Sequence, residues 1–166
     1  MESKEYLKRI NYEVNQAYKF ADLARKKGFD PEKRVDIPLA KNMAERVVRL
    51  VSIVAPQLVG VGMIRRIQDL EKEYGKTDWR ISLIIAKEVA SEKFCKFNNK
   101  LLAMETGIRV GFTYHTNGIV AAPLEGFVAL QIKKTMDGKE YFSMKFSGPI
   151  RGAGGTAEAF SVVIGD

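Results

Sequence analysis

Apolar positions in the first part of the chain recur with the period of a helix. Between residues 4 and 27 they fall alternately three and four positions apart, a heptad pattern that predicts one long helix. This stripe consists of Leu7, Ile10, Val14, Ala17, Ala21 and Ala24. A helix of this length is unusual in a small domain. The stripe therefore packs either against the rest of the chain, which is the simpler interpretation, or against a second copy.

Further stretches with helical spacing follow before residue 118. They cover residues 39–54, 63–74, 79–93 and 98–116. In the last stretch Gly107 and Gly111 share one side, so we expect another backbone to approach closely there. His115 ends the apolar stripe of the same stretch, which favours a packed histidine over a catalytic base. An extended connector is expected over residues 29–38, because Pro38 disfavours helix in the residue before it.

After residue 118 the apolar period changes from that of a helix to the two-residue period of a strand. The alternating residues are Val128, Leu130 and Ile132 in one run and Phe142, Met144 and Phe146 in the next. Asp137-Gly138 lies between the runs and is a strong signal for a hairpin turn. A glycine-rich stretch and an apolar run of helical character complete the sequence.

The sequence therefore predicts an α+β fold that is mainly α. Residues 1–118 are expected to form a multi-helix N-terminal domain. Residues 119–166 are expected to form a small antiparallel β-hairpin, a glycine-rich loop and the truncated start of a further helix, which would begin the next module.

Composition excludes several classes of protein. Cys95 is the only cysteine, so no internal disulfide can form, and with His115 as the only histidine a Cys/His zinc site is excluded. No apolar run is long enough to span a membrane, and the N-terminal residues are too charged for a secretory signal. These features favour a cytoplasmic protein. The net charge of +7 is compatible with DNA binding, although the basic excess is spread thinly along the chain.

The spacing of acidic, nucleophilic and histidine residues indicates no catalytic centre. No aspartate pair has the spacing that would hold Mg²⁺ on one face, and Glu71 and Glu73 point to different sides of their predicted helix. No serine or cysteine nucleophile has a histidine that the sequence places beside it. We expect no catalytic residue, metal ligand or cofactor site in this chain.

The glycine-rich stretch at residues 147–166 admits two interpretations. It lacks the lysine of a phosphate-binding P-loop and the spacing of the dinucleotide-binding fingerprint. A tight turn that caps the following helix is the simpler interpretation. The alternative is a contact with a phosphate backbone, made by free N–H groups at Gly154–Ala157 and by the adjacent Arg151. Glu158, in the first helical turn, opposes that alternative because its charge repels a phosphate.

Two segments carry a resemblance to a known family. The runs IVAAPLEGF (119–127) and FSGPIRGAGGTAEAFSVVIGD (146–166) resemble the N-terminal region of the large subunit of archaeal family D DNA polymerases. The run VDIPLAKNMAERV (35–47) and the long N-terminal helix fit the same pattern. The resemblance covers nearly the whole chain.

The resemblance implies a large, multidomain replicative polymerase that carries out template-directed DNA synthesis. In that family the active site lies in double-psi β-barrels much further along the subunit, Mg²⁺ is expected for the full polymerase, and a small subunit carries a nuclease-type domain with 3′–5′ exonuclease activity. The family's catalytic residues have no counterparts here, so the chain resembles an N-terminal, non-catalytic part of the large subunit.

By resemblance, the expected partners are DNA, the small subunit, the rest of the large subunit and a second copy of the chain. The candidate DNA-binding residues are Lys133, Lys134, Lys145, Arg151, Gly152, Gly154, Gly155 and Thr156. The heptad stripe is the candidate for self-association. One alternative is a purely structural scaffold that docks the small subunit. A more distant alternative is a small enzyme that binds a phosphate or nucleotide with the loop 152–156.

Overall fold

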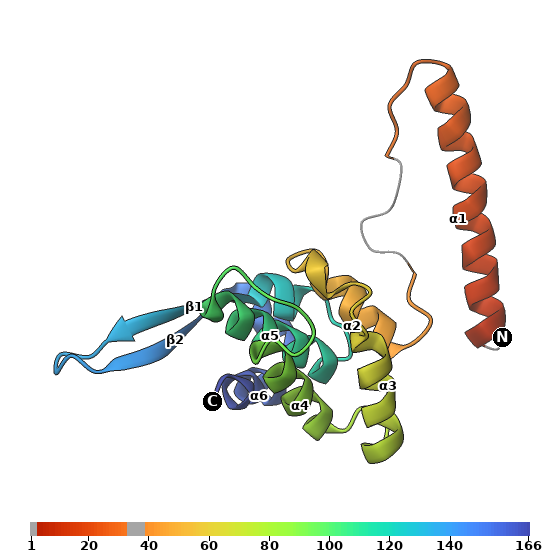
Figure 1. Cartoon of the computed structure of the whole chain (residues 1–166). Coiled ribbons are helices and arrows are strands. Elements are labelled where there is room, and N and C mark those ends of the chain that lie inside the picture. The colour runs from red at the N-terminus through yellow and green to blue at the C-terminus, as the bar shows by residue number, and fades with distance from the viewer. Residues whose placement is uncertain (1–2, 33–38) are drawn as a thin grey trace. The chain divides into compact units, whose positions relative to one another are not determined.

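The structure is a computed structural model that describes residues 3–32 and 39–166 (Figure 1). It contains two compact units, Met1–Lys41 and Asn42–Asp166. The connector expected over 29–38 and the first residues of the 35–47 run lie largely outside the described residues. The module boundary expected near residue 118 lies within the second unit and stays a prediction.

The first unit contains one continuous helix, α1 (Ser3–Lys26), as the heptad pattern predicts. The helix ends in a Schellman motif, in which Phe29 N–H donates to the carbonyl of Ala24 and Gly28 N–H donates to that of Arg25. Gly28 has a φ of 87°, which a residue with a side chain rarely adopts. Arg25 and Lys26 lie in the last turn, where the helix dipole favours positive charge.

The second unit is built around packed helices: α2 (Met43–Val51), α3 (Met63–Tyr74), α4 (Trp79–Ala90) and α5 (Lys100–His115), with a short 3₁₀ turn, η1 (Pro56–Leu58), between α2 and α3. The side chains of Asn42, Asp78 and Asn99 cap α2, α4 and α5 by accepting backbone N–H groups of the first turn. The cap at Asn42 explains why α2 begins later than the apolar pattern predicts.

The main core lies among α2, α3, α4 and α5. Its fully buried side chains include Val47, Leu58, Ile67, Ile85 and Tyr114. The Tyr114 hydroxyl accepts the N–H of Thr77 at 3.2 Å and donates to Glu71 at 3.2 Å, so its polar atom is satisfied at the edge of the core. Burial raises the pKa of Tyr114 to about 12, so this phenol stays protonated and remains a donor.

Two glycines of α5 allow α4 to pack unusually close. A Cβ atom on Gly107 would lie 2.5 Å from the carbonyl oxygen of Ala86, and one on Gly111 would lie 2.7 Å from that of Ser82. Both distances are shorter than any real contact of such atoms, so only glycine fits at either position. The close approach that the sequence predicts at Gly107 and Gly111 is confirmed.

A π-helical turn, η2 (Ala122–Gly126), leads into an antiparallel hairpin of β1 (Phe127–Lys134) and β2 (Glu140–Phe146). The predicted turn at Asp137-Gly138 joins the strands, with Gly138 at a φ of 83°. A 3₁₀ segment, η3 (Gly148–Ala153), then connects to α6 (Gly155–Gly165). Figure 1 shows the hairpin extending outward from the helices of the second unit. The expected α+β, mainly α, fold is confirmed.

The alternation predicted for the first strand is wrong at Val128. A β-bulge between Phe127 and Ala129 inserts one residue, so Phe127 and Leu130 are both buried while Val128 is 48% exposed. Phe127 and Leu130 join Ile108 in a second, smaller apolar cluster, against which Met144 and Ile164 pack. This cluster attaches the root of the hairpin to α5 and α6. Among the described residues no helix is long and apolar enough to cross a membrane.

Candidate nucleic-acid interface

The hairpin is anchored by one buried cation, Arg109 of α5. Its side chain donates to the carbonyl oxygens of Pro123 at 2.8 Å, Phe127 at 2.6 Å and Val128 at 2.8 Å. The residue is only 6% exposed, and its guanidinium carbon lies 4.8 Å from the centre of the Phe127 ring. The guanidinium thus satisfies carbonyl groups beside the bulge, where the extra residue disrupts the ladder.

Glu105 completes the anchor one helical turn earlier. Its Oε1 accepts from Nη2 of Arg109 at 2.9 Å, and its Oε2 accepts the backbone N–H of Leu130 at 3.0 Å. The buried charge of Arg109 is therefore paired and its hydrogen bonds are used, which is the condition for burying a guanidinium without a large loss of stability. The sequence pattern did not predict this pair. The only available signal was its i, i+4 spacing, which is equally typical of an exposed surface pair.

The second strand and the glycine-rich segment close the other side of the hairpin root. Ser147 N–H donates to the carbonyl of Gly126 at 2.8 Å, and the Ser147 hydroxyl donates to that of Glu125 at 2.5 Å. A Cβ atom on Gly126 would lie 2.7 Å from the backbone nitrogen of Ile150, so η2 and η3 meet backbone to backbone. The hairpin therefore leaves the helices through a joint that is fixed on both strands.

The strand register divides the hairpin into two faces. The pairs Ala129–Lys145, Gln131–Ser143 and Lys133–Tyr141 lie on one side, and the pairs Leu130–Met144, Ile132–Phe142 and Lys134–Glu140 lie on the other. The polar residues of the first side form what we call the basic hairpin face: Gln131, Lys133, Tyr141, Ser143 and Lys145. We call Leu130, Ile132, Phe142 and Met144 the apolar hairpin face.

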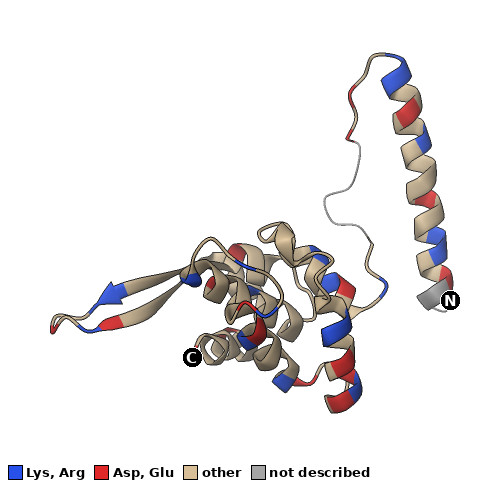
Figure 2. Cartoon of the chain, in the orientation of Figure 1, with Lys and Arg blue, Asp and Glu red and all other residues tan. Residues whose placement is uncertain are grey.

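The predicted lysines do not all lie together. Lys133 and Lys145 share the basic hairpin face. Neither forms an ion pair with an acidic residue in the described part of the chain. Lys134 lies on the opposite side, with its Nζ 3.8 Å from a carboxylate oxygen of Glu140. Figure 2 shows basic positions on both strands and acidic ones near the tip. The structure thus singles out Lys133 and Lys145 as uncompensated charges.

The tip of the hairpin is locally neutralised. Asp137 accepts a hydrogen bond from the Thr135 hydroxyl and forms an ion pair with Lys139 at 2.9 Å. The Thr135 hydrogen bond and then the Lys139 interaction hold the pKa of Asp137 below its usual value. Lys139 is therefore compensated, and the free positive charge lies on the strands rather than at the turn.

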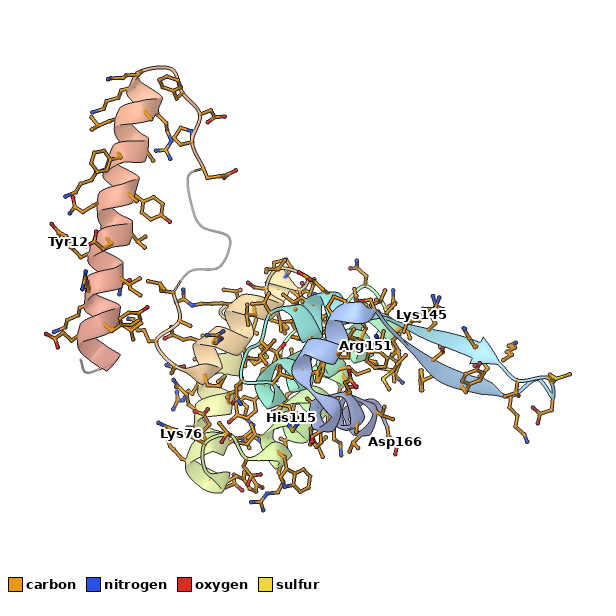
Figure 3. The ribbon with its side chains drawn as sticks, turned by 180° about the vertical axis from the view of Figure 1, so that it is seen from behind. Tyr12, Lys76, His115, Lys145, Arg151 and Asp166 are labelled. Atoms are coloured by element: carbon orange, nitrogen blue, oxygen red, sulfur yellow. The ribbon has the colours of Figure 1, made fainter. Side chains whose placement is uncertain are left out.

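The glycine-rich segment is exposed, but an acid lies close to its only cation. Gly152, Gly154, Gly155 and Thr156 are all on the surface, and no side chain caps the N-terminus of α6. Gly154 has a φ of 85°, so the turn into α6 requires glycine. Arg151 and Glu158 line the same hollow, together with Phe146 of β2. Figure 3 shows Arg151 and Lys145 near the root of the hairpin.

His115 is packed, as its position in the apolar stripe predicts. Its ring stacks on Phe160 of α6 with the ring centres 3.8 Å apart, and Trp79 meets Phe160 edge to face at 6.4 Å. Burial lowers the pKa of His115, which favours the neutral ring. His115 therefore fastens α6 to α5. In the part of the chain that the structure describes, no group of three or more His, Cys, Asp or Glu residues could hold a metal ion.

Comparison with known proteins decides the family. The family described as "DNA polymerase II large subunit DP2, N-terminal" matches residues 5–166. The chain belongs to this family. The resemblance found in the sequence is therefore confirmed.

Relatives named "DNA polymerase II large subunit" occur in several archaea. The protein of Nanoarchaeum equitans is 44% identical over 154 residues, which are 93% of this chain and 12% of the relative. That of Methanococcus vannielii is 45% identical over 162 residues, 98% of this chain and 13% of the relative. That of Thermoplasma volcanium is 40% identical over 166 residues, all of this chain and 14% of the relative. The chain thus spans only a small part of these relatives.

The two segments on which the sequence resemblance was based build the root of the hairpin. Residues 119–127 contain η2 and two of the carbonyl groups that Arg109 binds, and residues 146–166 contain η3 and α6. The segments meet at Gly126 and Ile150. The tip and the two free lysines lie between them in the sequence, on the part of the hairpin that this root holds in place.

The heptad stripe lies on one side of α1. Ala17 is exposed and the other five stripe residues are partly exposed. Three larger apolar side chains of the same helix, Tyr12, Phe20 and Leu23, are exposed as well and fall on a different side at the helical rotation per residue, whereas the exposed Tyr6 falls at the edge of the stripe, in line with Ala24. Tyr12, Phe20 and Leu23 do not follow the heptad spacing, so the pattern in the sequence gives no signal for them.

Proposed function

We propose that this chain is the non-catalytic N-terminal region of the large subunit of an archaeal replicative DNA polymerase, and that it contacts DNA and assists assembly. The observation that carries the DNA contact is the basic hairpin face, with Lys133 and Lys145 unpaired on a ribbon fixed at its root by Arg109. Membership of the family supports this proposal, because the relatives are named as polymerase large subunits.

The spacing of the two lysines suits a phosphate backbone. They lie four residues apart along the ribbon, or about 13 Å. Along the duplex axis one strand advances about 3.4 Å per phosphate, so a ribbon parallel to that axis would place the two lysines about four phosphates apart. Lysine binds phosphate as a point charge and reads no base, so we expect binding that is independent of sequence and sensitive to salt. Arg151 is exposed at the hairpin root, where Glu158 lines the same hollow and weakens its contribution to a phosphate contact.

The chemistry of synthesis is proposed to lie elsewhere in the full-length subunit. Mg²⁺ would serve the full polymerase, and the described residues offer no ligand group that fits it. Exonuclease activity is likewise assigned by this proposal to the small subunit. A cytoplasmic location follows from a role in DNA replication. The exposed apolar residues of α1 favour a second role in assembly, either with another copy or with the small subunit.

The DNA contact can be tested by titrating the chain into fluorescently labelled duplex DNA and measuring the fluorescence anisotropy at about 50 and 200 mM salt. The double variant Lys133→Gln/Lys145→Gln should bind more weakly, and the dependence of log affinity on log salt should fall by about two. The matched control is Lys134→Gln/Lys139→Gln, which removes the same charge from the same hairpin at residues that already have acidic partners. It should bind nearly as well as the unchanged chain.

Two results would contradict the proposal. If the unchanged chain does not bind DNA at the lower salt concentration, the scaffold role alone remains. If the two double variants lose the same affinity, the effect is one of net charge and the basic hairpin face has no special part in it.

A further inference from the structure

The outer half of the apolar hairpin face is uncovered. Leu130, at the inner end, is only 3% exposed, and Met144 beside it packs into the second apolar cluster. Farther out, the opposed pair Ile132 and Phe142 is 51% exposed at each residue. An apolar surface of this kind on an extended two-stranded ribbon is typical of a protein contact, because exposing it to water is unfavourable.

The last turn of α6 lies at the inner end of this face. A Cβ atom on Gly165 would lie 2.4 Å from Sδ of Met144 and 2.8 Å from its Cε, so the end of α6 lies directly against the Met144 side chain. Ile164 packs into the same cluster as Leu130. Asp166 N–H donates to the carbonyl of Val162 at 3.1 Å, so the helical backbone is held up to this point. Residue 166 is therefore placed beside the strand pair whose outer neighbours are Ile132 and Phe142.

A groove continues the apolar surface on the other side of the same turn. It lies between α4, α5 and the end of α6, and its apolar lining includes Leu83, Ala90, Met104, Ile108 and Val163. Met104 and Ile108 also belong to the cluster that holds Met144. The apolar hairpin face and the groove thus form one surface, and the end of α6 lies at their junction.

The matched relatives are much longer than this chain. This chain spans 12 to 14% of their length, and the family that it matches is described as an N-terminal region, which places most of a full-length large subunit after it. A segment joined directly to residue 166 is confined to the neighbourhood of the apolar hairpin face, so its effective concentration there is far higher than that of a separate partner. A tethered segment is therefore favoured over a second copy or another subunit as the occupant.

We propose that, in the full-length large subunit, the segment directly following Asp166 packs on the apolar hairpin face and covers Ile132 and Phe142. This inference rests on the proposed function, in that the chain is the N-terminal region of the large subunit. The contact braces the outer hairpin from one side and leaves the basic hairpin face free for DNA. The two faces of the ribbon thus have different partners.

Adjacent residues of β2 provide a matched test. Phe142 lies on the apolar hairpin face, and Tyr141, 45% exposed, lies on the basic hairpin face. In a Cys95→Ala background, Phe142→Cys and Tyr141→Cys are labelled with a maleimide in the 166-residue chain and in the full-length large subunit, without DNA. The cysteine at position 142 should react about 10-fold or more slowly in the full-length subunit. The cysteine at position 141 should react at a similar rate in both proteins.

A photo-crosslinker attached to the cysteine at position 142 identifies the occupant. Cross-links to the segment that follows Asp166 support the proposal, and cross-links to the small subunit or to a second copy overturn it. Equal labelling at position 142 in the two proteins also overturns it, as does equal protection of positions 141 and 142. Because no DNA is present, a failure here is separate from a failure of DNA binding. Circular dichroism of each variant verifies that the fold is intact.

Discussion

The guanidinium of Arg109 donates a 2.6 Å hydrogen bond to the backbone carbonyl of Phe127 and lies over the ring of the same residue. This contact joins the middle of α5 to the first residue of β1. It also explains the bulge, because the carbonyl groups of Phe127 and Val128 both turn to one side chain. The direction in which the hairpin leaves the helices is therefore set by a residue that never reaches the proposed DNA contact.

Replacing Arg109 should destabilise the whole second unit. Arg109→Met removes the buried cation while Glu105 and three backbone carbonyl groups lose their partner, so we expect the free energy of unfolding to fall by about 3–5 kcal/mol. Urea unfolding of the 166-residue chain measures the loss. Arg151→Met is the control, because Arg151 is exposed, and it should change stability by less than about 0.5 kcal/mol. Equal effects of the two substitutions would contradict the anchoring role.

The helices could be predicted from the sequence because their signal is local. Apolar spacing identified each of them, and errors were confined to ends such as that of α2, where the Asn42 cap decides the start. The bulge at Val128 could not be predicted, because the apolar and polar residues of this run alternate as they would in a regular strand. Its cause is Arg109 on another element, and a pattern read along one strand contains no information about that contact.

The candidate site was predicted only in part. The hairpin and its lysines followed from the alternation and from the Asp137-Gly138 turn. The separation of Lys134 from Lys133 and Lys145 follows from simple alternation, but its pairing with Glu140 depends on the strand register. The proximity of Glu158 to Arg151 follows from the sequence, because both residues lie in the glycine-rich stretch, whereas Phe146 of β2 joins the same hollow only through the tertiary fold.

Adding a side chain at the close contact between α4 and α5 should reduce the stability of the fold. Gly107→Ala places a methyl group 2.5 Å from a backbone oxygen that cannot move aside without shifting α4, so we expect a loss of about 1–3 kcal/mol. Gly152→Ala is the matched control, since a Cβ atom there would meet no other atom within 4 Å. Thermal unfolding of the two variants compares them. A Gly107→Ala variant as stable as Gly152→Ala would show that the helices pack less closely than described.

Stability should decrease as the solution becomes mildly acidic, through His115. Burial lowers the pKa of this ring in the folded chain, so the unfolded chain takes up the proton at a higher pH. The contribution of the neutral His115 ring to the free energy of unfolding is therefore present above the pKa of histidine in the unfolded chain, about 6.5. It is lost as pH falls below that value. The urea midpoint should drop between about pH 7.5 and pH 5.5, and His115→Gln should remove most of that drop. A drop of the same size in His115→Gln would assign it to another group.

The heptad stripe of α1 should control any self-association of the chain. Ile10→Glu places a charge in the stripe, where a second helix could not bury it without a large desolvation penalty, so a dimer should dissociate while the monomer stays folded. Sedimentation equilibrium measures the mass and circular dichroism measures the helix content. Asn15→Glu is the control, because Asn15 is an exposed polar residue of the same helix outside the stripe, and it should leave association unchanged. If Ile10→Glu unfolds the chain instead, the stripe belongs to an intrachain core.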